Sequence, residues 1–527
     1  TARWPVLSIE QWQRLLVALR ENRQRAPQRE EYWSRFRAAL ARVGTRFADA
    51  AHPLHASALA TLPGYTGFSQ AMIRLTLGAM DMWALDSFAA AFRLAPTLGA
   101  SVDWQPMAGL SGRLRFYPAG RWQRSMGWLP GRGGRLLFGA SSPPELVAGY
   151  GAGNVPGTAL MIAFLAQATT LAGGPPPVTV VKNSRREPIF APLVLSALED
   201  EDPELVATIA VLVWDYAEAT VQEQLLTSAN LVIAAAGDAT IAQIGDALRR
   251  RPDAGAARFH PHGHKVSFSA IGREVLARGH TIEAKGPLSI DVVSLLAALD
   301  SVFWDQHGCL SSRVHFFETG GDGKHAPLEY ATRLTNQLRL LATFLPRGAW
   351  PRQRLYDRFD HYKLLEQTGR VQVLSAYEDE FVVALDERPP DERAFLAQVN
   401  DCEGRVIVVR PVADLMEVPD SYLRLIPALN LQSLSVAVGQ VGEDLTDRFL
   451  SFAEACGERG VTAIRTVGRA AFPQLAYSWD GLIPMDLVRT RPEGHFTTIE
   501  FEAPFDEMVD TYRLFLQQGA ALGLGQD

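Results

Sequence analysis

The stretch VAGYGAGNVPGTALMIAFLAQATTLA, residues 147–172, decides the fold class. It begins as a short apolar strand, passes through a glycine-rich turn at 151–157 and continues as an uncharged helix. The helical part is shorter than the about 18 to 20 residues that cross a bilayer, and it ends at GGPPP. We therefore expect a strand followed by a helix that is buried against a sheet.

The same alternation continues toward the C-terminus. VTVVK at 178–182 precedes a helix that starts after Pro188, TIAVLVW precedes the helical TVQEQLLTSA, and LVIAAAG at 231–237 leads into TIAQIGDALRR. A second alternating region contains the strands SRVHFFE, GRVIVVRP and LQSLSVAV. Repeated alternation of strand and helix predicts parallel, doubly wound sheets, which bind ligands at the carboxyl ends of their strands.

These patterns predict an α/β protein with two doubly wound domains. Residues 1–105 contain helical patterns such as REEYWSRFRAALARVG and predict a mainly helical N-terminal region. We expect a cofactor-binding α/β domain at 106–290, a catalytic α/β domain at 291–470, and a C-terminal segment at 471–527 that returns to the cofactor domain. Within that segment HFTTIEFEAP, residues 495–504, alternates like an edge strand that needs cover, from a second subunit or from a loop of its own domain.

Composition narrows the class of protein. A chain of 527 residues is too long for one compact core, and a net charge of -7 offers no basic field for a nucleic acid. The three cysteines, at 309, 402 and 456, form neither a disulfide framework nor a metal-ligand pattern. The N-terminus lacks the pattern of a secretory signal, so we expect a cytoplasmic protein that does not span a membrane.

Two polar stretches follow predicted strands. In GAGNVPG, 151–157, the backbone around Asn154 is fixed by Pro156 and Gly157, which directs its amide to the ligand edge; the spacing also suits a plain turn. In VKNSRREP, 181–188, a strand delivers cations that suit a phosphate group or a solvated turn. These cations are Lys182, Arg185 and Arg186.

A third stretch, HPHGHKVSF at 260–268, contains three histidines. His260, His262 and His264 share one face of an extended chain and so suggest a zinc site. However, no nearby carboxylate or cysteine completes a ligand set. We expect structural or supporting histidines and no metal.

The fourth stretch, WDQHGCLSS at 304–312, surrounds Cys309 with small and polar residues. The segment from Leu310 to Ser312 is a candidate helix start, whose dipole would lower the pKa of the thiol. This setting is typical of a nucleophile. Cys402 and Cys456 have no such setting and are expected to pack as small apolar side chains.

Four motifs together resemble a known family, the LuxC-type acyl-CoA reductases, which are related to the aldehyde dehydrogenase superfamily. The motifs are GNVPG at 153–157, KNSRREPIFAP at 182–192, HGHKVSF at 262–268 and DQHGCLS at 305–311. They occur in the order of the family, and the resemblance extends from about residue 110 to about residue 490. It does not cover residues 1–100.

The resemblance implies an aldehyde dehydrogenase-like fold and the reduction of an acyl thioester to an aldehyde. Cys309 would take the acyl group, while the Asn154 amide and the Cys309 backbone N–H hold the oxyanion. His262, His264 and His307 become candidate proton donors. The hydrolytic relatives carry a glutamate base where this chain has residues 261–265, without a carboxylate, and this loss favours reduction over hydrolysis.

The resemblance also implies a nicotinamide cofactor bound by the domain at 106–290. Lys182 corresponds to a lysine that contacts the adenosine ribose, with Ser184 and Arg186 in the same turn. Arg185 replaces an acidic residue that is frequent in NAD-preferring relatives, which favours NADPH. Gly237 resembles the glycine that starts the helix beneath the pyrophosphate, and Glu403 is a candidate for the nicotinamide ribose.

The family suggests medium or long acyl groups carried by coenzyme A or by an acyl carrier protein, which the N-terminal helices would dock. Its superfamily commonly associates through a projecting hairpin and a late strand, for which RLRFYPAGRWQRSMGWL and HFTTIEFEAP are the counterparts, so a homo-oligomer is expected. Three other classes stay open: a hydrolytic aldehyde dehydrogenase, a cysteine acyltransferase and a non-catalytic scaffold.

Overall fold

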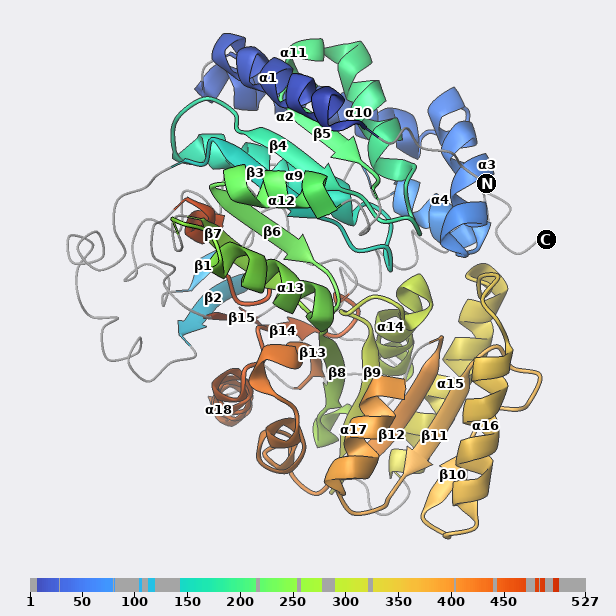
Figure 1. Ribbon diagram of the computed structural model, residues 1–527. Coiled ribbons are helices and arrows are strands. Elements are labelled where there is room, and N and C mark those ends of the chain that lie inside the picture. Colours follow the sequence, from blue (N-terminus) through green and yellow to red (C-terminus); the bar gives the residue numbers. More distant parts are fainter. Residues whose placement is uncertain are drawn as a thin grey trace.

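The computed structural model contains two β-sheets, one above the other in Figure 1, with helices packed around both. The helices and strands described here lie within residues 7–27, 29–78, 80, 104–106, 112–118, 143–214, 219–253, 257–276, 290–320, 326–401, 404–438, 443–470, 479–482, 484–488 and 496–501.

The smaller sheet has five parallel strands in the order β5-β4-β3-β6-β7. Its strands are β3 (Leu146–Tyr150), β4 (Val178–Lys182), β5 (Ile209–Leu212), β6 (Leu231–Ala235) and β7 (Arg258–His262). The main connecting helices are α9 (Thr158–Ala168), α10 (Phe190–Glu201), α12 (Ala219–Ser228) and α13 (Asp238–Arg249), with the short α11 (Pro203–Val206). The strand order reverses between β3 and β6, which confirms the expected doubly wound sheet and marks its ligand-binding edge.

The larger sheet has ten strands in the order β1-β2-β15-β14-β13-β8-β9-β12-β11-β10. Seven of them, from β15 to β11, are parallel, and the flanking pairs β2–β15 and β11–β10 are antiparallel. The strands are β1 (Gln105–Pro106), β2 (Arg113–Pro118), β8 (Val266–Ile271), β9 (Ser312–Glu318), β10 (Val371–Val373), β11 (Val382–Asp386), β12 (Val406–Val412), β13 (Leu431–Ala437), β14 (Ala463–Thr466) and β15 (Phe496–Phe501).

Long helices cover this sheet, and short helical turns join its elements. The long helices are α14 (Ile290–Val302), α15 (Ala326–Phe344), α16 (Gln353–Glu366), α17 (Glu392–Asp401) and α18 (Glu443–Arg459). The short turns of the protein are η1 (Thr169–Ala172), η2 (Arg273–Leu276), η3 (Phe303–Gln306), η4 (Val418–Tyr422), η5 (Leu423–Leu425), η6 (Ala428–Asn430) and η7 (Pro484–Leu487). The helices and strands expected at 291–470 are confirmed.

Two strands lie elsewhere than expected. Strand β8 belongs to the larger sheet, although we placed the boundary at residue 290, and β15 joins this same sheet instead of returning to the cofactor domain. Nor is β15 an edge strand, because β2 and β14 flank it on both sides. A period-two pattern shows that a segment is a strand, but the partner is chosen by long-range packing.

The step from β7 to β8 brings the two sheets edge to edge. Only residues 263–265 separate these strands, so the carboxyl edge of the smaller sheet meets the amino edge of the larger one. All parallel strands of each sheet run the same way, which places the ends of several strands at this junction. Side chains from both domains can therefore converge there.

The N-terminal region packs against the smaller sheet. It forms α1 (Ile9–Arg25), α2 (Arg29–Ala48), α3 (Pro53–Thr66) and α4 (Gln70–Gly78), which confirms the expected helices up to residue 78. Trp12 of α1 is fully buried in the core of that sheet, and the Tyr32 hydroxyl of α2 donates to Gln167 Oε1 at 2.9 Å. Arg35 pairs with Asp202 at 2.7 Å. These helices are thus an integral layer of the domain.

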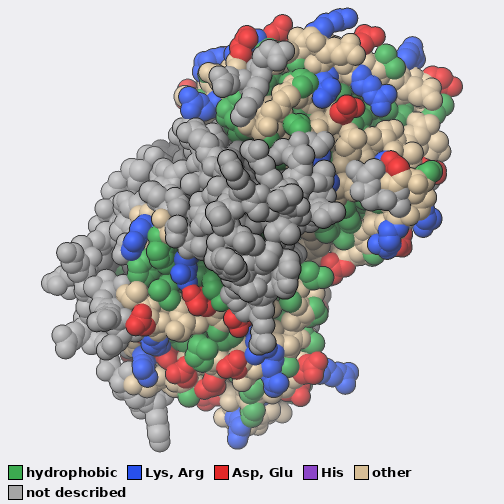
Figure 2. Space-filling model, turned by 90° about the vertical axis from the view of Figure 1, so that its left-hand side faces the viewer, with side chains coloured by type: hydrophobic (Ala, Val, Ile, Leu, Met, Phe, Trp, Pro, Cys, Tyr) green, Lys and Arg blue, Asp and Glu red, His purple; other side chains and the backbone are tan. Residues whose placement is uncertain are grey.

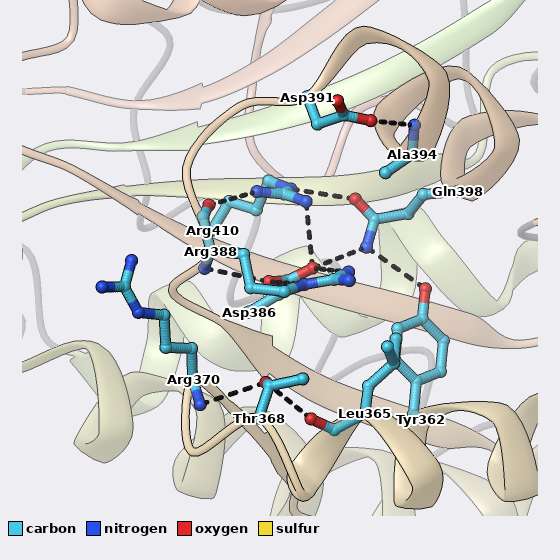
Figure 3. A network of polar contacts seen from close by, with 10 residues as sticks. All are labelled: Tyr362, Leu365, Thr368, Arg370, Asp386, Arg388, Asp391, Ala394, Gln398 and Arg410. Carbon is cyan, nitrogen blue, oxygen red and sulfur yellow. Dashed lines mark hydrogen bonds and ion pairs between the residues drawn. The ribbon is translucent and has the colours of Figure 1, made fainter.

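The carboxyl end of the larger sheet holds a dense polar network, drawn in Figure 3. Asp386, at the end of β11, accepts from Arg388, from Arg410 of β12 and from Gln398 of α17. Gln398 in turn accepts from Arg410 and donates to Tyr362. Burial alone would raise the pKa of Asp386, but the two arginines hold it below its ordinary value.

The described surface is of mixed charge on the face in Figure 2, where Lys and Arg side chains are interspersed with Asp and Glu. In the parts of the chain that the structure describes, no helix is both long enough and apolar enough to cross a membrane.

Candidate functional site

The loop before β9 has an unusual backbone. Trp304, Asp305 and Gln306 are consecutive non-glycine residues with φ of 54°, 49° and 63°. Left-handed backbone costs roughly 1–2 kcal/mol per residue for side chains other than glycine. Such a run persists only where its surroundings hold it, and it directly precedes His307, Gly308 and Cys309.

Buried hydrogen bonds of Asp305 hold the first part of this loop. Its Oδ1 accepts from Arg405 Nε at 2.8 Å, and both side chains are 1% exposed. Its Oδ2 accepts from the Gly348 N–H at 3.0 Å and from Trp350 Nε1 at 3.2 Å. The carboxylate thus links the cysteine loop to the start of β12 and to the segment after α15.

Gln306 holds the second part. Its Nε2 donates to the carbonyl oxygens of Ser312 and Val406, at 2.9 and 2.8 Å, and its Oε1 accepts from the Val406 N–H at 2.7 Å. All three partners are backbone groups at the amino ends of β9 and β12. The loop is therefore fixed to the amino edge of the larger sheet.

Cys309 lies at this edge and is half-buried. Its carbonyl oxygen accepts from Ser267 Oγ of β8 at 2.7 Å. No helix begins after it: residues 309–311 form a turn, and strand β9 begins at Ser312. The expectation of a helix N-terminus that lowers the thiol pKa is wrong, because the amino end of a buried strand occupies that place.

The surroundings of the Cys309 sulfur raise its pKa to about 11. Burial is the main cause, followed by the nearby carboxylate of Asp480. A hydrogen bond from the Gln432 side chain and the charge of Arg313 act in the opposite direction. Cys309 is thus a protonated thiol at rest, and it needs a proton acceptor to become a nucleophile.

Asn154 reaches the cysteine loop from the other domain. Its Nδ2 donates to the His307 carbonyl oxygen at 2.9 Å, two residues before Cys309. The turn that carries it is closed by Gly157, whose φ of 87° suits glycine, and by buried Glu187, which accepts from the Gly157 N–H. A side-chain amide has two N–H donors, so one remains beyond the bond to His307.

Asp480 and Gln432 belong to the same site, and neither was predicted. Asp480 Oδ1 accepts from Gln432 Nε2 at 2.6 Å, and its Oδ2 lies 2.9 Å from His262 Nδ1. Trp479 and Leu482 exchange backbone hydrogen bonds around Asp480 (φ 51°) and Gly481 (φ 83°), which is the geometry of a type I′ turn. The Asp-Gly pair in the sequence was the available signal for this turn.

The candidate histidines lie in different surroundings. His262 is buried, stacks on Trp479 with ring centroids 3.5 Å apart, and shares Asp480 with the Cys309 site. The His307 ring lies between Phe68 and Trp350, at 6.3 and 4.2 Å. His264 is exposed, and its backbone N–H bonds to Asp238. Of the three, His262 is the one that the structure connects to Asp480.

The third histidine of that stretch, His260, is also engaged by the protein. Its Nε2 lies 3.2 Å from the Asp486 carbonyl oxygen, and burial lowers its pKa to about 3. No group of three or more metal-binding side chains occurs among the described residues.

The predicted cofactor residues gather at the carboxyl edge of the smaller sheet. Lys182 ends β4, is buried, and has its Nζ 5.8 Å from the Trp214 ring. Ser184 packs so closely against Gly153 that a Cβ built on Gly153 would lie 2.1 Å from Ser184 Oγ. Arg185 and Arg186 are exposed beyond it. Glu403 and Cys402 lie outside the described residues.

Gly237 stands at the other side of this edge, at the start of α13. No side chain caps the helix there, and nothing lies within 4 Å of a Cβ built on Gly237. An open, uncapped helix N-terminus accepts phosphate groups. The open space at Gly237, beside the switch point between β3 and β6, fits the phosphate groups of a dinucleotide.

The family model of the acyl-CoA reductases (LuxC) matches residues 135–490, more than half of the chain. A comparison with curated proteins found no match.

Solved aldehyde dehydrogenases have a similar fold. An NAD-dependent benzaldehyde dehydrogenase from Corynebacterium glutamicum is 14% identical with a TM-score of 0.54, and 88% of each chain is covered. Aldehyde dehydrogenase 21 from Physcomitrella patens is 12% identical with a TM-score of 0.56, over 94% of this chain and 91% of that one. The glyceraldehyde-3-phosphate dehydrogenase GapN from Methanocaldococcus jannaschii, complexed with NADP, is 11% identical with a TM-score of 0.53, over 94% of this chain and 95% of that one. At these identities the likeness establishes the aldehyde dehydrogenase fold.

Proposed function

The chain belongs to the acyl-CoA reductase (LuxC) family, and from this premise we propose that it reduces an acyl thioester to the aldehyde with NADPH through an acyl-Cys309 intermediate. It is an aldehyde-forming oxidoreductase with an aldehyde dehydrogenase-like fold. The bond from Asn154 Nδ2 to the His307 carbonyl oxygen supports the acyl-Cys309 intermediate, because it joins two family motifs from different domains beside Cys309.

The chemistry starts with attack of the Cys309 sulfur on the thioester carbonyl. The carbonyl oxygen becomes an oxyanion, and the second N–H of the Asn154 amide and the Cys309 backbone N–H are the donors proposed to hold it. Collapse releases the thiol carrier and leaves the acyl group on Cys309. The carrier is coenzyme A or the arm of an acyl carrier protein, and medium or long acyl chains are proposed.

A bound nicotinamide would supply hydride to the acyl carbon. Lys182, Ser184 and the N-terminus of α13 at Gly237 would hold the dinucleotide, and the exposed Arg185 favours the 2′-phosphate of NADPH. The resulting hemithioacetal then breaks its C–S bond, which releases the aldehyde and returns the Cys309 thiolate. His262, His264 and His307 remain candidate proton donors for these steps.

Hydrolysis is the second candidate function, and one observation favours it. The stretch 261–265 has no carboxylate, but Asp480 brings a carboxylate to the Cys309 site from the C-terminal part of the chain. A base of this kind can activate water. Against it, both oxygens of Asp480 already accept hydrogen bonds, from His262 and Gln432.

The test is to incubate the protein with a long-chain acyl-CoA and NADPH and to identify the product. We expect aldehyde, with acyl-Cys309 found by mass spectrometry when NADPH is omitted, and neither in Cys309→Ala. Cys456→Ser is the matched control, since Cys456 is fully buried away from this site. A carboxylic acid product would favour hydrolysis, and acyl transfer without any NADPH oxidation would favour an acyltransferase. No acylation at all would favour a scaffold.

Homo-oligomer formation remains a proposal as well. The proposed hairpin at 113–129 contributes β2, but residues 119–142 lie outside the described part of the chain. Strand β15 already pairs on both sides within its own chain, so a partner subunit would have to use another edge.

A further inference from the structure

We propose that Asp480 is a positioning residue that controls the protonation of Cys309: one carboxylate oxygen orients the His262 imidazole and the other orients the Gln432 amide at the sulfur. The Asp480–His262 pair then accepts the thiol proton during acylation and returns it to the leaving thiolate. This inference rests on the proposed function and assigns the proton chemistry of the same site.

The geometry separates the two tasks of Asp480. Oδ2 lies 2.9 Å from His262 Nδ1, and Oδ1 lies 2.6 Å from Gln432 Nε2. An ionised carboxylate only accepts hydrogen bonds, so Nδ1 of His262 carries the proton and Nε2 is left as the basic nitrogen. His262, Asp480 and Gln432 are each 4–6% exposed, so bulk water competes little for these bonds.

The local backbone holds this arrangement in place. Asp480 occupies a left-handed position with φ of 51° in the tight turn between Trp479 and Leu482. Trp479 covers the His262 ring at 3.5 Å with an interplanar angle of 9°. One turn thus supplies both the carboxylate and the aromatic cover of the imidazole, although it lies more than 200 residues from His262 in sequence.

Gln432 connects this pair to the reacting atom. Its side-chain amide is anchored by Asp480 and lowers the pKa of the Cys309 thiol. The next residue, Ser433, donates its N–H to Ser267 Oγ, which donates to the Cys309 carbonyl oxygen at 2.7 Å. Within the described part of the chain, Gln432 Oε1 has no hydrogen-bond partner.

The charges of the site support the assignment. Burial lowers the pKa of His262, so the imidazole is neutral, while His262 and Lys265 hold the pKa of Asp480 below its ordinary value against the effect of burial. The resting pair therefore carries one negative charge, which disfavours a thiolate at Cys309. The other charges that face it are Arg313, from β9, and Arg465, from β14.

Transfer of the Cys309 proton to His262 removes the repulsion between the negative Asp480–His262 pair and the thiolate while the sulfur attacks the acyl carbon. The Cys309 S–H bond breaks, His262 takes the proton, and the pair becomes a neutral imidazolium–aspartate while the sulfur forms its bond to the acyl carbon. When the thioester C–S bond breaks, the imidazolium gives its proton to the leaving carrier thiolate. The pair is then restored, and the number of protons is unchanged.

The test measures Cys309 reactivity without any substrate. The rate of alkylation by iodoacetamide follows the thiolate fraction, and mass spectrometry counts the adduct at position 309. Asp480→Asn removes the charge at constant shape, so we expect the Cys309 pKa to fall by about one unit and alkylation at pH 8 to become about tenfold faster. Acylation by acyl-CoA should nevertheless slow by about a hundredfold or more, because the proton acceptor has lost its partner.

Two further variants, Gln432→Leu and His262→Phe, should change the rates of alkylation and acylation differently from Asp480→Asn. Gln432→Leu removes a donor to the sulfur, so alkylation should slow. His262→Phe keeps the stacking on Trp479 but removes the proton acceptor, so acylation should fall with little gain in alkylation. The controls Asp360→Asn and Gln372→Leu, both exposed on α16 and β10, should match the wild type in both assays.

The proposal is overturned if the alkylation profiles of Asp480→Asn and Asp360→Asn coincide, or if Asp480→Asn speeds acylation as much as alkylation. If Asp480→Asn does not fold, an unchanged alkylation rate in Gln432→Leu and unchanged acylation in His262→Phe overturn it instead. A failure of the proposed function would give another result. The wild type would then form no acyl-Cys309, while the variants would still change the rate of Cys309 alkylation.

Discussion

The two ends of the larger sheet each hold a buried carboxylate, but with different hydrogen-bond partners. At the carboxyl end, Asp386 accepts hydrogen bonds from Arg388, Arg410 and Gln398, and Arg410 also donates to Gln398 (Figure 3). At the amino end, Asp480 bonds to the His262 imidazole and the Gln432 amide, and the charges of Lys265 and Arg465 act on it from nearby. The first end lowers a carboxylate pKa by pairing it with cations, whereas the second raises a thiol pKa to about 11.

The backbone conformation also differs between the amino and the carboxyl end of the larger sheet. The amino end is preceded by three left-handed residues, Trp304 to Gln306, which are held by buried hydrogen bonds to neighbouring segments and by packing of Trp304 on Phe68. The network around Asp386 sits on regular strands and a regular helix. Local strain, and a buried Gln432 oxygen without a partner among the described residues, mark the amino end, which is the proposed reactive end. The arginine and glutamine side chains that all bond to Asp386 mark the carboxyl end as the structural end.

Removal of the carboxylate at the structural end should have the largest effect on stability. Asp386→Ala leaves Arg410, which is 2% exposed, without its counter-charge, and breaking such a buried pair costs about 3–5 kcal/mol. We expect a lower denaturation midpoint in urea, while the Cys309 alkylation rate below the transition stays unchanged. Asp360→Ala, on an exposed face, is the control. A changed alkylation rate would mean that the two ends are coupled.

The reactive end should show the reverse pattern. Asn154→Ala removes a proposed oxyanion donor, and loss of such a donor lowers kcat by about 10²–10³, or about 2.7–4 kcal/mol of barrier. The denaturation midpoint should shift little, because the amide makes one bond to a loop carbonyl. Single-turnover acylation of Cys309 measures the effect, with exposed Asn336→Ala as the control. Equal losses in rate and midpoint would argue for a structural role.

The pH dependence of unfolding tests the histidines that lie outside the reactive site. Burial lowers the pKa of His315, on β9, and of His260, on β7, to about 3. A lowered folded-state pKa means that the unfolded chain binds the proton first, so stability is present above pH 6.5 and is lost as pH falls from about 6.5 toward 3.

Each of these histidines should change the unfolding equilibrium about tenfold per pH unit in that window. His315→Gln can still bond Ser301 and Tyr330. It should lower by one the number of protons taken up on unfolding, which sets the slope of the unfolding free energy against pH. Urea unfolding at a series of pH values measures it, and exposed His361→Gln should leave the slope as in the wild type. An unchanged slope in His315→Gln would show that His315 titrates normally.

The smallest effect concerns the cofactor edge. Arg185→Glu should lower the ratio of kcat/KM for NADPH over NADH by about two- to fivefold, because Arg185 is exposed and exposed charge pairs are weak. Arg370→Glu, which lies at the far end of the larger sheet, is the control. If Arg185→Glu leaves the ratio of the two specificity constants unchanged, the reason for choosing NADPH is lost.

Much of the fold was predictable because its signals are local. Apolar strands such as 178–182 and 231–235 alternate with amphipathic helices, and this pattern alone predicts a doubly wound sheet. The turn carrying Asn154 and the loop carrying Cys309 were also identified in advance, and the structure brings them together through the His307 carbonyl. Spacing along the chain cannot show that His264 is exposed while His262 is buried.

The predictions that failed depended on what surrounds a residue. The sequence after Cys309 suits a helix start, but strand β9 is drawn into the sheet by pairing with β8 and β12. Likewise β15 has the alternation of an edge strand, yet β2 pairs with it from a position nearly 400 residues earlier. Neighbouring strands supply these hydrogen bonds, and no local pattern encodes them.

The sequence by itself determined the α/β class and the positions of most strands and helices, because periodicity and turn chemistry act over a few residues. Only the tertiary structure decided which groups surround Cys309 and raise the pKa of its thiol, and which side chains bond to Asp480. Electrostatic interactions and desolvation depend on distances in space, and folding brings residues 262, 309, 432 and 480 into one buried site from four separate segments.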